Sequence, residues 1–93
     1  MSKHFVILIA LRGKTSPANE VIERILSERI TDWLRFTRGQ YVVWYNGNTE
    51  EIYNLLKPLL DPEDSILVVE TNLATRKGWA GKPTGDWLAK EFT

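Results

Sequence analysis

The chain of 93 residues suits one small domain, and its 43% hydrophobic and 26% charged residues are typical of a folded protein rather than a disordered one. Twelve basic and twelve acidic side chains cancel, so no overall field attracts nucleic acid or an anionic membrane. The sequence contains no cysteine, no signal peptide and no membrane-spanning run, and we therefore predict a cytoplasmic protein without membrane contact.

The first third of the chain predicts a strand followed by a helix. Residues 5–11 form a continuous apolar run, typical of a strand buried on both faces, and Gly13 ends it. Ser16 and Pro17 then predict a helix start, with the hydroxyl residue as N-cap and proline at the first helical position. Apolar residues recur at helical spacing from there to Ile30, so we expect an amphipathic helix of about four turns.

A hairpin follows, and its second strand has apolar or aromatic side chains on both faces. Residues 32–37 are more polar, which favours an edge strand, and Arg38 and Gly39 turn it into the central strand 38–46. Alternate side chains of a strand point to opposite faces. One face carries Tyr41, Val43 and Tyr45, and the other carries Val42 and Trp44. The three residues of the first face are candidate contacts for a second subunit or for the C-terminal tail.

Local signals also mark a second helix and a fourth strand. Asn48 and Glu51 have the spacing of a capping box and predict the start of the helix. Pro58 ends or kinks this helix, because proline removes a backbone hydrogen bond and clashes with the preceding turn. Residues 61–64 indicate a polar turn, and residues 65–70 indicate the strand.

The predicted elements follow the order β-α-β-β-α-β over residues 4–70, which is typical of a ferredoxin-like α+β sandwich. We expect an antiparallel four-stranded sheet with two helices on one face, formed by residues 1–70 of a single domain. Residues 71–93 form a C-terminal tail, in which Trp79 and Trp87 anchor the chain to an apolar surface of its own core or of a partner subunit.

Little in the sequence points to catalysis. The only histidine, His4, lies beside the N-terminus, and no cysteine is present, so a nucleophile with a histidine base is not supported. We therefore predict no catalytic residue, no metal ligand and no cofactor. Asp61, Glu63 and Asp64 leave one alternative open, because clustered carboxylates can hold a divalent cation. A turn with solvated charges is the simpler interpretation.

Basic side chains form two local groups that could contact phosphate. The first group, at one end of the predicted sheet, consists of Arg12, Lys14, Arg35 and Arg38. The second group lies in the tail and consists of Arg76, Lys77 and Lys82. The acidic turn 61–64 should lie near the first group and neutralise part of it. A solvated or salt-bridged surface is the alternative interpretation of both groups.

Three local features resemble those of a known group of small proteins. They are the hairpin between Trp33 and Trp44, Asp64 placed before the apolar strand 66–69, and a tail with Trp79-Ala80-Gly81 and Asp86-Trp87-Leu88. With the element order, they resemble the ferredoxin-like superfamily that includes the second CRISPR-adaptation protein and the VapD-type toxin ribonucleases. The resemblance implies a homodimer, which in the CRISPR branch bridges two integrase subunits and holds DNA on its basic surface. In the nuclease members it implies a metal-binding Asp at the end of the first strand, where this chain has Ala10-Leu11-Arg12.

These observations predict a non-catalytic homodimeric scaffold that binds nucleic acid or a partner protein. One alternative is a metal-dependent endonuclease of the same superfamily, using carboxylates of the 61–64 turn. Another is a ferredoxin-like protein-interaction module unrelated to nucleic acid. In the predicted fold a second copy covers the open face of the sheet, and the competing cover is the chain's own tail.

Overall fold

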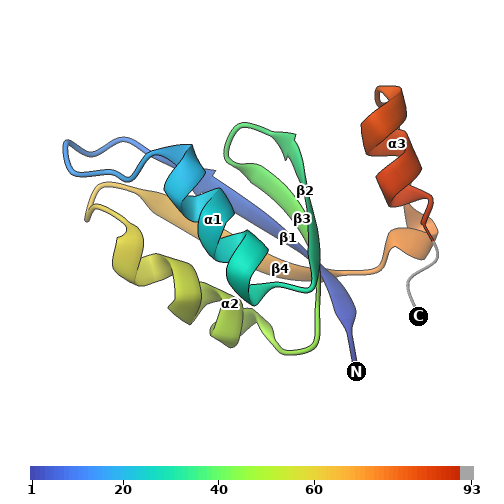
Figure 1. The fold of residues 1–93 in the computed structure, drawn as a ribbon, viewed down its shortest axis with the longest axis horizontal. Helices are drawn as coiled ribbons and strands as arrows, with labels where there is room; N and C mark the ends of the chain where they lie inside the picture. The colour runs from blue at the N-terminus through green and yellow to red at the C-terminus, as the bar shows by residue number, and fades with distance from the viewer. Residues whose placement is uncertain (91–93) are drawn as a thin grey trace.

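Four antiparallel strands and three α-helices make up the part of the protein, residues 1–90, that a computed structural model describes (Figure 1). The strands are β1 (Lys3–Ala10), β2 (Asp32–Thr37), β3 (Gln40–Tyr45) and β4 (Ser65–Thr71). The α-helices are α1 (Asn19–Arg29), α2 (Thr49–Leu56) and α3 (Lys82–Leu88), and the short 3-10 turns are η1 (Lys57–Leu59) and η2 (Leu73–Thr75). The protein is therefore a small α+β domain.

The strand order in the sheet is β2-β3-β1-β4, with antiparallel pairing between all neighbours. The strand β2 is an edge strand and β3 is an interior one, as the sequence predicts. Figure 1 shows α1 and α2 side by side along one face of the sheet, while α3 lies apart from them beyond β2.

The core lies between the sheet and the helices α1 and α2. Its fully buried side chains come from odd-numbered positions of β1 and β3 and from one stripe of each helix, because alternate strand residues share a face. They are Phe5, Ile7, Ile22, Leu26, Tyr41, Val43, Ile52 and Leu56. Burying an aliphatic or aromatic side chain of this size contributes roughly 1.5–3 kcal/mol, so this layer holds the two helices on the sheet.

The first helix begins later than the sequence predicts. Its first residue is Asn19 and its N-cap is Ala18, which makes no side-chain capping bond. The Ser16 hydroxyl instead accepts a hydrogen bond from the Gly13 N–H at 2.9 Å and donates one to Asp64 Oδ1 at 2.5 Å. Because that hydroxyl is used by the preceding loop, the helix starts only after the loop has ended.

The signals for the second helix are confirmed. Asn48 accepts a hydrogen bond from the Glu51 N–H at 2.9 Å, and the Glu51 side chain accepts one from the Asn48 N–H at 3.1 Å. The helix ends at Leu56, and Pro58 lies in the 3-10 turn that follows. These contacts join residues at most four positions apart, which is why the sequence alone predicts them.

The hairpin between β2 and β3 depends on a glycine. Gly39 has a φ angle of +78°, and its carbonyl oxygen accepts a hydrogen bond from the Ile9 N–H at 2.7 Å. A Cβ atom at this position would lie 2.4 Å from the Ile9 carbonyl oxygen. The turn therefore needs glycine both for its backbone conformation and for its close approach to β1.

The tail leaves the sheet after β4, and its helix α3 packs against β2. It passes through η2, which Asn72 caps by accepting a hydrogen bond from the Ala74 N–H, and then forms α3 against β2. The last part of the predicted tail, residues 91–93, lies outside the described residues. In residues 1–90 no helix is both long and apolar enough to cross a membrane.

Candidate interaction surface

The sheet face opposite α1 and α2 exposes a cluster of aliphatic side chains on β1 and β4. Cross-strand pairing places Val6 opposite Val69 and Leu8 opposite Leu67, so these four residues, named here the aliphatic patch, are direct neighbours. Leu8, Leu67 and Val69 are 39%, 54% and 44% exposed. None of the four is charged. Water therefore contacts an apolar surface at the centre of two adjacent strands.

This placement corrects the choice of Tyr41 and Val43 as contacts for a second subunit or the tail. Their side chains are 1% and 0% exposed and pack in the core, and Tyr45 packs against the same core. The register Phe5↔Val43 puts the odd positions of β3 beneath the helices together with those of β1. Both faces of β3 are apolar, so the sequence could not show which face the helices take.

A shallow hollow continues the aliphatic patch toward the end of β1. Its volume is about 300 Å3. The lining combines the patch residues Leu8 and Leu67 with the β2–β3 turn and the start of β4. Arg38 is exposed and lies at this hollow, while the Arg12 guanidinium approaches the Ser65 hydroxyl at 3.5 Å. The structure therefore brings Arg12 and Arg38 to the same end of the sheet, as predicted.

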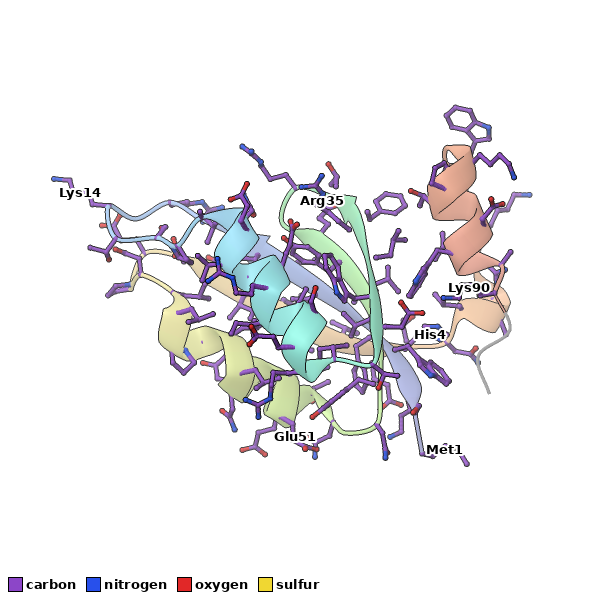
Figure 2. All side chains as sticks on the ribbon, viewed as in Figure 1. Met1, His4, Lys14, Arg35, Glu51 and Lys90 are labelled. Atoms are coloured by element: carbon purple, nitrogen blue, oxygen red, sulfur yellow. The ribbon has the colours of Figure 1, made fainter. Side chains whose placement is uncertain are left out.

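Arg35 does not belong with those two arginines. It extends toward α1, where its guanidinium lies 3.4 Å from a Glu23 carboxylate oxygen, and that oxygen also accepts a hydrogen bond from the Tyr41 hydroxyl at 3.1 Å. Burial and then the Glu23 charge raise the pKa of Tyr41. Figure 2 shows Lys14 at the tip of the loop between β1 and α1, well away from Arg35 on β2. The predicted four-residue basic group is therefore split.

The carboxylate of Asp64 binds the loop that follows β1. Its Oδ1 accepts hydrogen bonds from the backbone N–H groups of Arg12 at 2.7 Å and Gly13 at 3.1 Å, and from the Ser16 hydroxyl. Burial raises the pKa of Asp64, but hydrogen bonds from Ser16, from Arg12 and from the Asp61 N–H outweigh this and hold the pKa at about 2. Asp64 is therefore a structural anion of the loop.

Asp61 has a similar role and is almost fully buried. Its Oδ2 accepts hydrogen bonds from the Thr15 N–H at 2.9 Å and from the Thr15 hydroxyl, and its Oδ1 accepts one from the Glu63 N–H at 2.8 Å. The Thr15 hydroxyl and these N–H groups lower the pKa of Asp61. The interpretation of this turn as solvated charges is therefore wrong for Asp61 and Asp64, whose oxygens accept hydrogen bonds from backbone N–H groups and from the Thr15 and Ser16 hydroxyls.

The tail contacts the opposite end of the open face through Trp87. The Trp87 indole N–H donates to Asp32 Oδ1 at 3.1 Å, and the Lys90 ammonium lies 2.5 Å from Asp32 Oδ2. Burial raises the pKa of Asp32, but hydrogen bonds from Lys90 and Trp87 outweigh it and lower the pKa overall. The His4 ring lies 4.6 Å from the Trp44 ring and 6.1 Å from the Trp87 ring. Figure 2 shows His4 at this tail contact, on the same side as Lys90.

A larger cavity separates the tail from the other end of β2. Its volume is about 710 Å3, and it is named here the tail cavity. Its lining consists of Phe36, Arg76, Lys77, Gly78, Trp79, Ala80, Gly85 and Leu88. Phe36 is 51% exposed and Trp79 is 93% exposed. Trp79 therefore does not anchor the tail to its own core, which corrects one of the two alternatives for this residue.

Comparison with protein-family models, with curated proteins and with solved structures found no match to this chain. The resemblance to CRISPR-adaptation and VapD-type proteins thus stays a prediction from short sequence features.

Proposed function

We propose that this protein is a non-catalytic homodimeric scaffold of ferredoxin-like architecture that binds nucleic acid or a partner protein. The strand order β2-β3-β1-β4 with antiparallel pairs supports the ferredoxin-like assignment. The observation that carries the proposal is the aliphatic patch on the open face of that sheet. Exposed apolar side chains that adjoin one another on a rigid sheet mark an interaction surface.

A second copy of the chain is the occupant that fits the aliphatic patch. The patch carries no charge that would select a charged partner, and its complement is another apolar surface. Twofold pairing supplies that surface, because the same patch then serves both subunits. Within residues 71–90 of the tail, Trp87 contacts the sheet at Asp32 and His4, at the other end of β1 and at β2, away from the patch.

The hydrogen-bonded carboxylates of Asp61 and Asp64 support a scaffold rather than an endonuclease. Metal-assisted phosphodiester cleavage needs carboxylate oxygens that converge on one ion. The oxygens of Asp61 and Asp64 instead accept hydrogen bonds from residues 12–16 and from the turn itself. A metal at this turn would have to displace those donors and release the loop after β1.

Light scattering of the purified protein at micromolar concentration tests the proposal. The expected mass is that of two chains of 10.7 kDa each. A mass of one chain that does not change as the concentration rises would contradict the homodimer. Far-ultraviolet circular dichroism of the same sample confirms that the protein measured is folded.

A further inference from the structure

Two exposed aromatic rings lie at the tail cavity. Phe36 projects from the edge strand β2 and Trp79 from the tail, and their exposed fractions are 51% and 93%. The exposed faces of these two rings can stack on a flat partner. Nucleobases are such partners, because each base has a π-face that stacks on an aromatic ring.

Two cationic side chains line the same cavity. Arg76 uses one N–H of its guanidinium to bond the Leu73 carbonyl oxygen at 2.8 Å, which leaves its other donors for a ligand. Within residues 1–90 neither Arg76 nor Lys77 forms an ion pair. The carboxylate of Asp86 on α3 is held by Lys82 at 3.0 Å. The cavity is therefore locally positive although the whole chain is neutral.

The volume of the cavity and the chemistry of its lining further restrict the kinds of ligand that it can bind. A volume of about 710 Å3 lies within the roughly 300–1,000 Å3 that ligand pockets span. Within residues 1–90 the lining has no carboxylate, amide or hydroxyl side chain. Such a site cannot read base edges or a ribose 2′-hydroxyl through side-chain acceptors. Stacking on bases and contacts to phosphates give binding that tolerates different sequences.

We propose that the tail cavity binds single-stranded nucleic acid, with Phe36 and Trp79 stacking on bases and Arg76 and Lys77 contacting the adjoining phosphates. This deepens the proposed function, because it names the partner that the scaffold holds and the site that holds it. The carboxylates of an acidic peptide would satisfy the two cations but have no π-face to stack on the two aromatic rings. The nucleic acid is therefore the ligand that accounts for all four side chains.

Fluorescence anisotropy with labelled oligothymidylate and oligouridylate of roughly twelve nucleotides, at about 50 mM salt, tests this site. We expect similar affinity for the two oligomers and weaker binding of a duplex of equal length. Trp79→Ala should weaken binding about tenfold, and Trp79→Phe should retain most of it. Lys77→Gln should reduce the slope of log affinity against log salt by about one. Trp79 is nearly fully exposed, so its substitution removes little packing.

Lys57→Gln is the matched control, since Lys57 is also an exposed lysine but lies in η1 after α2, outside both basic groups. The proposal is overturned if Trp79→Ala binds as well as the wild type, or if Lys57→Gln weakens binding as much as Lys77→Gln does. Equal displacement of the oligomer by an acidic peptide would also overturn it. Light scattering of the same variants measures their mass, and so tests the homodimer separately from nucleic-acid binding. A loss of mass in Trp79→Ala would make the cavity a subunit contact instead.

Discussion

Leu67→Asp should dissociate the proposed homodimer without unfolding the subunit. Leu67 lies on β4 opposite Leu8 and is 54% exposed. Full burial of a leucine side chain is worth about 2 kcal/mol, so covering the exposed half gains about 1 kcal/mol per subunit and about 2 kcal/mol per twofold contact. The aspartate would also bury two unpaired carboxylates, at several kcal/mol each. We therefore expect the dissociation constant to rise at least 100-fold.

Sedimentation or light scattering over a dilution series measures this change, with circular dichroism as the check on folding. Tyr53→Asp is the matched control, because Tyr53 is 39% exposed and lies on α2, away from the open face. It introduces the same charge at a comparable exposed apolar site. We expect Tyr53→Asp to keep the mass of the wild type.

Two results would refute the reasoning. If Leu67→Asp and Tyr53→Asp both stay dimeric at the dilutions where the wild type does, the aliphatic patch is not the contact. If the wild type is monomeric, exposed aliphatic side chains on this face do not imply a second copy. Leu67→Ala removes apolar burial without adding a charge. A smaller rise in the dissociation constant for Leu67→Ala than for Leu67→Asp would therefore support separate contributions from lost burial and from buried charge.

Three further predictions concern the turns and the carboxylates. Gly39→Ala should lower the free energy of unfolding by about 2 kcal/mol, because Gly39 has a φ angle of +78°. Gly78→Ala should leave the free energy of unfolding unchanged, because a Cβ atom at Gly78 meets no atom within 4 Å. Thermal denaturation of the two variants compares these effects. The pKa of Asp64 is lowered to about 2, so its stabilising contribution is present above about pH 4 and is lost as the pH falls toward 2. Acid unfolding followed by tryptophan fluorescence should therefore show a shallower pH dependence in Asp64→Asn, and an unchanged profile would contradict this role. The protein should not cleave labelled RNA or DNA with magnesium or manganese, and cleavage that disappears in Asp64→Ala would favour the endonuclease instead.

The local signals in the sequence predicted most of the elements. The capping box of Asn48 and Glu51, the helix end before Pro58 and the hairpin turn at Gly39 all follow from residues within a few positions of one another. The start of α1, which lies later than Ser16 and Pro17 predict, shows the limit of such signals. Ser16 has the chemistry of an N-cap, but Asp64, 48 positions away, takes its hydroxyl.

The candidate site was much less predictable. Tyr41 and Leu67 are both apolar residues of apolar strands, yet one is 1% exposed and the other 54%. Nothing local distinguishes them, because the pairing register with β1 decides which face each side chain joins. The tail cavity could not be predicted from local sequence either, because it brings Phe36 near Trp79 across more than forty residues of chain.

The sequence by itself determined the type and order of the strands and helices, because side-chain alternation, helical periodicity, capping and proline geometry act over at most a few residues. It also determined that both faces of β1 and β3 are apolar. Only the tertiary structure decided that the helices cover the Tyr41 face, that Asp61 and Asp64 hold the loop after β1, and that Arg35 pairs with α1. Each of these depends on chain segments that meet through sheet pairing and packing, over sequence separations that no local pattern encodes.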